Sequence, residues 1–157
     1  MTNRRGFTLI IGIGNPDRGD DAAGRVVAAK LKARVPRDVR AIESDGEATA
    51  LLARFSEADE VILVDAAMSG AAPGTIGCFD AHDAPLPASR VAVSSHGFGL
   101  AAAIELARLL GQLPRRCVVY TIEGRSFALG EGFSPGVDAA IEAIVARILD
   151  RVCAKAG

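Results

Sequence analysis

Acidic and imidazole side chains stand at three places where an aliphatic run of this sequence ends. Asp21 follows the segment GIGNPDRGD, Asp65 follows the run VILV, and His96 lies in the segment VSSHGFGL. If the aliphatic runs are parallel strands of one sheet, their carboxyl ends share one edge, and the three side chains converge there. Two carboxylates and one imidazole suit a divalent metal such as zinc or nickel and leave coordination positions for a substrate.

Each of these residues also has a simpler structural interpretation. Asp20 or Asp21 can cap the helix that follows, and His96 can be an ordinary loop residue before a helix that starts at Leu100. Asp65 is harder to explain in this way. A carboxylate that follows four aliphatic residues of a central strand is costly to remove from water unless it has a partner.

Other catalytic and binding motifs are poorly supported. The Gly-x-Gly-Asn after the first strand has Asp17 where a dinucleotide site needs its third glycine, and the acidic pair that follows would repel a pyrophosphate. Neither a P-loop nor an HExxH zinc motif is present. Ser94 and Ser95 adjoin His96, but no GxSxG segment marks a nucleophilic serine. His82 is expected to be a surface loop residue.

Composition limits the protein class further. The chain has 157 residues, and we expect one domain covering residues 1–157. Its net charge of −1 and its low aromatic content of 4% argue against a nucleic-acid partner. The apolar runs are too short to cross a membrane. Three widely spaced cysteines without a CxxC motif predict free thiols in the cytoplasm. Because no strongly apolar surface helix stands out, we expect a monomer.

Alternating strands and helices must position these residues. We expect five strands, at Thr8–Ile13, Val39–Glu43, Glu60–Ala66, Thr75–Asp80 and Arg116–Ile122. The fourth follows the third too closely for a helical crossover and should be antiparallel. Helices are expected from about Val26 to Val35 and over Ala48–Phe55, Leu100–Leu110 and Pro135–Cys153, with loops over Ala81–Ser89 and Glu123–Pro135. This pattern predicts an α/β fold, a single-domain three-layer α/β/α sandwich with a mostly parallel five-stranded sheet.

The motifs together resemble the hydrogenase maturation proteases, endopeptidases that trim the C-terminal tail from the large subunit of nickel–iron hydrogenases. That family carries Gly-x-Gly-Asn and an acidic pair after strand one, an Asp at the end of strand three, and a Ser-x-His before a helix. The matching residues here are Gly12, Gly14, Asn15, Asp20, Asp21, Asp65, Ser94 and His96. The resemblance covers nearly the whole chain and implies the phosphorylase/hydrolase-like version of the sandwich.

The resemblance also implies a site and a mechanism. The family's metal ligands and catalytic residues correspond to Asp21, Asp65 and His96, which would recognise nickel already inserted in the substrate, the large-subunit precursor. Zinc or another divalent metal could occupy the site in isolation. Water polarised by the metal or the carboxylates is the expected nucleophile, as in an aspartic-type or metal-dependent endopeptidase.

Two positions depart from the family pattern. The family often has Glu where Asp21 stands, which is one methylene shorter. The family's Asp-Gly-Gly-Thr segment after strand two is replaced by a segment in which Gly46, Glu47 and Ala48 are the expected substrate-binding residues.

Two other functions remain open. The first is a peptidyl-tRNA hydrolase-like esterase, whose strand-one loop also contains Gly-Asn-Pro, but no basic RNA-binding face is evident here. The second is a non-enzymatic nickel-binding chaperone that uses the same three ligands without cleavage.

Overall fold

One five-stranded sheet forms the centre of the protein. The structure, a computed structural model, describes residues 6–86 and 95–154, and the side chains of residues 95–98 lie outside this description. The strands lie in the order β2-β1-β3-β5-β4, and β4 alone runs antiparallel, to its neighbour β5. Their bounds are Thr8–Ile13 for β1, Val39–Ser44 for β2, Glu60–Ala67 for β3, Ile76–Asp80 for β4 and Arg116–Glu123 for β5.

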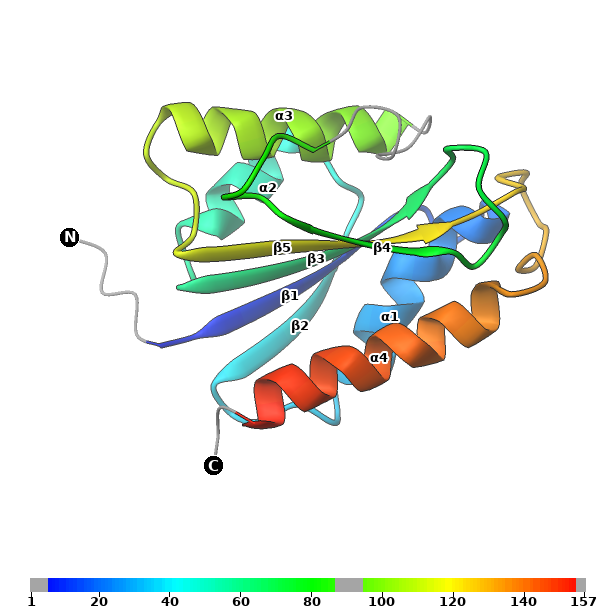
Figure 1. Cartoon of the computed structure of the whole chain (residues 1–157), viewed down its shortest axis with the longest axis horizontal. Coiled ribbons are helices and arrows are strands. Elements are labelled where there is room, and N and C mark those ends of the chain that lie inside the picture. Colours follow the sequence, from blue (N-terminus) through cyan, green and yellow to red (C-terminus); the bar gives the residue numbers. More distant parts are fainter. Residues whose placement is uncertain (1–5, 87–94, 155–157) are drawn as a thin grey trace.

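Helices cover both faces of this sheet (Figure 1). Their bounds are Gly19–Ala22 for the 3₁₀ helix η1, Ala23–Leu31 for α1, Ala48–Phe55 for α2, Ser95–Leu109 for α3 and Val137–Ala154 for α4. Helices α1 and α4 pack on one face, and α2 and α3 pack on the other. The predicted three-layer α/β/α sandwich with one antiparallel strand is therefore confirmed.

Strand β3 shows how the sequence pattern produces the layers. All eight of its residues are buried, as expected for a parallel strand that is covered on both faces. Ile62 and Val64 pack against α1 and α4, whereas Val61 and Leu63 pack against α2 and α3. Because side chains alternate along a strand, Asp65 belongs to the α2 and α3 face.

Helix boundaries differ most from the sequence prediction. Helix α3 begins at Ser95, so the loop expected at Ser95 and His96 is instead the first turn of the helix. Its glycines disfavour a helix locally, and the contact with α2 overrides that preference. Helix α4 begins at Val137 and not at Pro135, because Gly136 has a φ of 93°, which no helical residue adopts.

Two further expectations concern the end of helix α1 and the segment that precedes α3. Helix α1 ends at Leu31, earlier than the predicted Val35. Residues 87–94, which include Ser94, lie outside the described residues. Within the described ranges, no helix is long and apolar enough to span a bilayer.

Candidate active site at the carboxyl ends of the strands

Asp65 lies near the carboxyl end of β3 and is 0% exposed. Its Oδ1 accepts a hydrogen bond of 2.8 Å from the backbone N–H of Ala66, and its Oδ2 has no hydrogen-bond partner among the described residues. Burial raises the pKa of Asp65 well above its usual range, the hydrogen bond from Ala66 opposes this, and the nearby charge of Asp21 adds to the rise. A buried carboxyl group with an unused oxygen is a suitable ligand for a cation.

Asp21 comes from the short helix η1 and is also 0% exposed. Its Oδ2 accepts a hydrogen bond of 3.2 Å from the N–H of Asn15. Gly14 makes this placement possible, since a Cβ there would lie 1.8 Å from the carbonyl oxygen of Asp21. The second glycine of Gly-x-Gly-Asn therefore lets η1 pack directly on the end of β1 and brings Asp21 close to Asp65.

Neither acid of the pair caps a helix. Both Asp20 and Asp21 lie inside η1, and the residue that flanks the start of α1 is Ala22, which makes no side-chain cap. The capping interpretation was wrong because the chain enters α1 through a 3₁₀ turn and not through an extended residue, which a side-chain cap requires.

His96 lies in the first turn of α3, which begins on the side of the sheet where β1, β3 and β5 end (Figure 1). Its side chain lies outside the described residues, so its convergence with Asp21 and Asp65 stays a prediction. Within the described part of the chain, no three His, Cys, Asp or Glu residues are grouped as a metal site. The described core of the site is thus the pair of carboxyl groups.

The loop after β2 lies against α3. A Cβ on Gly99 would be 2.1 Å from the carbonyl oxygen of Gly46, so the two backbones touch. Glu47 caps α2, because its carboxylate accepts hydrogen bonds from the N–H groups of Thr49 and Ala50 at 3.0 and 2.9 Å. Ala48 begins α2 and packs partly into the core. Their predicted substrate contacts are untested, but this loop does lie against the helix that carries His96.

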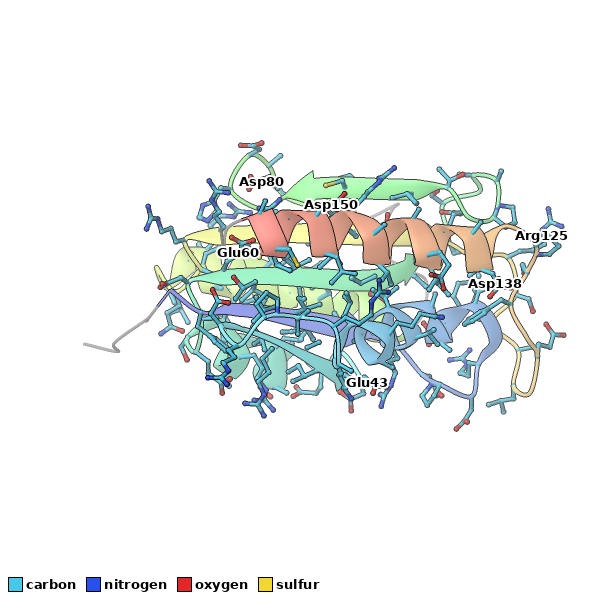
Figure 2. All side chains as sticks on the ribbon, turned by 90° about the horizontal axis from the view of Figure 1, so that it is seen from below. Glu43, Glu60, Asp80, Arg125, Asp138 and Asp150 are labelled. Carbon is cyan, nitrogen blue, oxygen red and sulfur yellow. The ribbon has the colours of Figure 1, made fainter. Side chains whose placement is uncertain are left out.

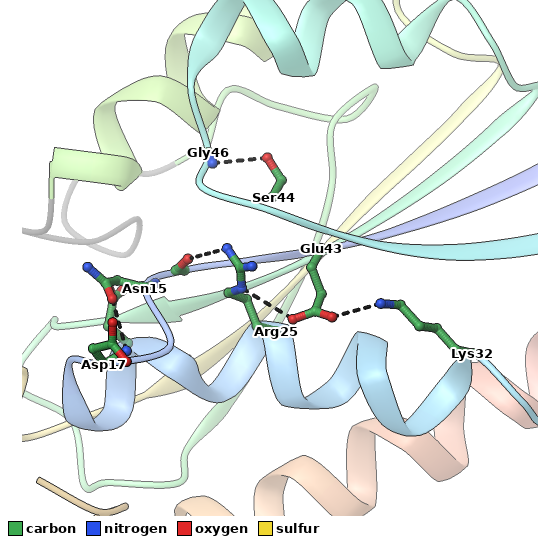
Figure 3. A network of polar contacts seen from close by, with 9 residues as sticks. Asn15, Asp17, Arg25, Lys32, Glu43, Ser44 and Gly46 are labelled. Carbon is green, nitrogen blue, oxygen red and sulfur yellow. Dashed lines mark hydrogen bonds and ion pairs between the residues drawn. The ribbon is translucent and has the colours of Figure 1, made fainter. Parts of the chain in front are cut away.

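An ion-pair network joins the loop after β1 to the end of β2 (Figure 3). Arg25 donates to the carbonyl oxygen of Gly14 and to Glu43, each at 3.3 Å. Lys32 donates to the other oxygen of Glu43 at 2.7 Å. The hydrogen bond from Lys32 lowers the pKa of Glu43 and outweighs the effect of burial. The network fixes the position of α1 relative to the strand ends that carry the candidate site.

Asp20 has a structural role that the sequence analysis missed. Its carboxylate accepts hydrogen bonds from the N–H groups of Arg125, Ser126 and Ser134 and from the Ser134 hydroxyl, at 2.7, 3.1, 2.7 and 2.7 Å. Burial alone would raise the pKa of Asp20, but these bonds outweigh it and hold the pKa below its ordinary value. Asp20 thus anchors the β5–α4 loop beside Asp21.

Glu123 is a second buried acid that the sequence analysis missed. It is 3% exposed and accepts hydrogen bonds from the N–H groups of Ser69 and Gly70, at 2.6 and 3.0 Å, and from the Ser69 hydroxyl at 2.9 Å. The argument that singled out Asp65, a carboxylate at the end of an aliphatic strand, applies equally to Glu123. It could have been found from the sequence.

Other candidate nucleophiles and ligands lie away from this site. Cys117 is buried, and burial, with the charge of Asp80 adding to it, raises the pKa of its thiol to about 12. His82 follows β4, and its Nε2 lies 2.7 Å from the carbonyl oxygen of Pro114. His82 is exposed in a turn, as expected for a surface loop residue, and burial keeps the Cys117 thiol protonated.

Comparison with known proteins identifies the family to which this chain belongs. Residues 26–151 match the sequence model of a family described as HycI, hydrogenase maturation protease. Comparison with curated protein sequences found no significant match. The structure is similar to that of the hydrogenase maturating endopeptidase HybD from E. coli, with a TM-score of 0.82 and 26% identity over 95% of this chain and 93% of that chain.

A second solved structure is also similar. It is the [NiFe] hydrogenase maturation protease HycI from Thermococcus kodakarensis KOD1, with a TM-score of 0.70 and 29% identity over 94% of this chain and 93% of that one. The family match covers most of the sequence, and the structural matches cover nearly all of it. The chain therefore belongs to the hydrogenase maturation protease family, a family of endopeptidases.

Proposed function

We propose that this protein removes the C-terminal extension of a nickel–iron hydrogenase large-subunit precursor after nickel has been inserted. Asp21, Asp65 and His96 recognise the nickel that the precursor presents, and cleavage follows only when the metal is present. The substrate therefore supplies the metal, and the protein supplies ligands that complete its coordination.

The pairing of two fully buried carboxyl groups, Asp21 and Asp65, is the observation that carries this proposal. Two neighbouring carboxylates repel each other and are costly to bury, and a divalent cation between them relieves both costs. The unused Oδ2 of Asp65 supplies one oxygen ligand, and oxygen and imidazole ligands suit nickel. A metal site with so few protein ligands leaves coordination positions free for ligands from the precursor.

Peptide-bond cleavage in this proposal uses water and forms no covalent intermediate. A water molecule polarised by the metal or by the carboxyl groups attacks the scissile carbonyl carbon. Cys117 does not compete for this role, because its thiol is buried and stays protonated. An acyl-enzyme trapped on Ser95 or on a cysteine would contradict this step.

Intact-mass analysis of a precursor tests the function. The purified protein is incubated with nickel-loaded and with nickel-free large-subunit precursor, and the loss of the tail is followed over time. We expect loss of the tail only from the nickel-loaded precursor. Asp65→Asn should abolish it, since the amide that replaces one oxygen is a poor metal ligand.

A matched control separates the loss of a metal ligand from the loss of one negative charge. Asp38→Asn makes the same change in charge at an exposed residue next to the amino end of β2, and we expect full activity. Equal cleavage of nickel-free precursor would refute recognition of the metal. Tight nickel binding by the protein, with no cleavage of any precursor, would favour the chaperone function.

A further inference from the structure

A cavity of about 250 Å³ lies just beyond the carboxyl ends of β3 and β5, at the edge of the sheet that carries the candidate active site. Its walls include Met68 and Pro73 from the β3–β4 loop and Gly124 and Arg125 from the β5–α4 loop. The N–H of Gly124 donates to the carbonyl oxygen of Ala67 at 2.9 Å, so the cavity begins where β3 and β5 end together. Met68 is three residues beyond Asp65, which places the cavity about 10 Å from the site along the strand direction.

Buried carboxylates hold both walls of this cavity in place. Glu123 binds the N–H groups of Ser69 and Gly70 on one side. Asp20 binds the N–H of Arg125 at 2.7 Å on the other side. Each anchoring acid is nearly or completely buried, at 3% and 1% exposure. The backbone around the cavity is therefore positioned before any substrate arrives, which lowers the entropy cost of binding.

Arg125 is the one cationic side chain among the described residues that line this cavity. It is exposed, and it forms no ion pair with any described residue. Figure 2 shows Arg125 at the end of the molecule where the β5–α4 loop lies. The carboxylate of Glu123, the acid in the cavity wall, already accepts three hydrogen bonds. An incoming carboxylate is thus the natural partner for this guanidinium.

We infer that this cavity is a subsite for the C-terminal extension of the substrate, in which Arg125 binds a carboxylate of that extension. The inference rests on the proposed function. An extended peptide advances about 3.3 Å per residue, so a carboxylate about three residues beyond the scissile bond reaches Arg125. The carboxylate is that of an acidic side chain or of the C-terminus. Met68, 37% exposed, offers an apolar surface to the neighbouring residue of the extension.

Steady-state kinetics on a nickel-loaded precursor that the wild-type protein processes test this subsite. Arg125→Ala should lower kcat/KM about tenfold, mainly through KM, because it removes one charge-assisted contact to the substrate. Arg125→Lys should recover only part of the loss, since it cannot bind a carboxylate through two parallel hydrogen bonds. Arg37→Ala removes an exposed arginine that precedes β2 and should leave the kinetics unchanged.

Changes in the extension identify the carboxylate. One precursor carries Asn or Gln in place of every acidic residue of the extension, and a second ends in a C-terminal amide. Whichever precursor lacks the bound carboxylate should be processed about tenfold less efficiently, and Arg125→Ala should then add no further loss. Arg125→Glu, combined with Lys at the identified position of the extension, should restore part of the activity.

Two outcomes overturn the inference. One is an Arg125→Ala protein that is as efficient as wild type. The other is an Arg125→Ala protein whose kcat/KM falls by the same factor on the unchanged precursor and on both altered precursors. Failure of the wild type to process any nickel-loaded precursor would instead refute the proposed function. Binding of a synthetic extension peptide, measured by calorimetry, then decides the inference: weaker binding to Arg125→Ala supports the subsite, and equal or absent binding to both proteins refutes it.

Discussion

Asp20→Asn should destabilise this protein far more than a single change of surface charge does. Oδ2 of Asp20 accepts three hydrogen bonds, from the N–H groups of Arg125 and Ser126 and from the Ser134 hydroxyl, and Oδ1 accepts one from the Ser134 N–H. If the amide oxygen of the introduced asparagine takes the position of Oδ2, its NH₂ group faces the N–H of Ser134, donor against donor. The opposite orientation loses the two bonds from the N–H groups of Arg125 and Ser126, and only the Ser134 hydroxyl, which can also accept, keeps its contact.

The magnitude follows from these contacts. One lost hydrogen bond to a charged group costs about 1.5–3 kcal/mol, and the three bonds that remain weaken because their acceptor is now neutral. We expect Asp20→Asn to lower the free energy of unfolding by about 3 kcal/mol, a large part of the roughly 5–15 kcal/mol typical of a domain. Asp17→Asn is the control, because Asp17 is exposed and loses the same charge.

Urea denaturation followed by far-ultraviolet circular dichroism measures this difference, since the chain has no tryptophan and one tyrosine. Hydrogen exchange at the amides of Arg125 and Ser126 should also accelerate in Asp20→Asn. A loss within about 0.5 kcal/mol of that in Asp17→Asn would refute the reasoning, because surface substitutions span that range.

Acidification provides a second test of the same contacts. The pKa of Asp20 in the folded protein lies below its ordinary value of 3.8, so its contribution to stability is complete above that value and is lost as the pH falls through the folded pKa. The difference in stability between wild type and Asp20→Asn should therefore shrink as the pH is lowered below 3.8. A difference that stays constant or grows would contradict the role of the ionised carboxylate.

Two further predictions concern packing and thiol reactivity. Gly24→Ala should cost at least about 2 kcal/mol in urea denaturation, because its Cβ would lie 2.4 and 2.5 Å from the carbonyl oxygens of Val64 and Ile13. Gly132→Ala, where a Cβ meets nothing within 4 Å, is the control, and equal stability of the two variants would contradict the packing argument. In the native protein a thiol reagent should label Cys78 and Cys153 but not Cys117, since only Cys117 is buried, with a pKa of about 12. Rapid labelling of all three thiols before unfolding would contradict this structure.

Much of the secondary structure could be predicted from the sequence. The predicted bounds of β1 and α2 match the structure, and β2, β3 and β5 each extend by one residue. These elements are defined by local features, namely continuous aliphatic runs and the Gly, Pro and Asn residues that interrupt them. The inner face of α4 also follows from helical spacing alone, because the aliphatic residues that recur at this spacing in the sequence are buried, namely Val137, Ile141, Ile144, Val145 and Ile148.

The site itself was predictable only in part. Asp65 follows from the sequence, because a carboxylate at the end of a buried strand needs a partner. The position of Asp21 beside it depends on a close backbone contact with Gly14, and the start of α3 depends on packing against α2. Neither contact has a local signature strong enough to override the helix and turn propensities of the residues involved.

The sequence by itself determined the layers of this protein, the order of its elements along the chain and the strand ends at which the candidate site lies. The tertiary structure alone decided which contacts each of the two adjacent acids, Asp20 and Asp21, makes. Asp20 and Asp21 are adjacent and chemically identical, yet one anchors a loop through Ser134, 114 residues away, and the other lies close enough to Asp65 for its charge to raise the pKa of that residue. The local sequence is the same for both, and only contacts between distant segments give each carboxylate its environment.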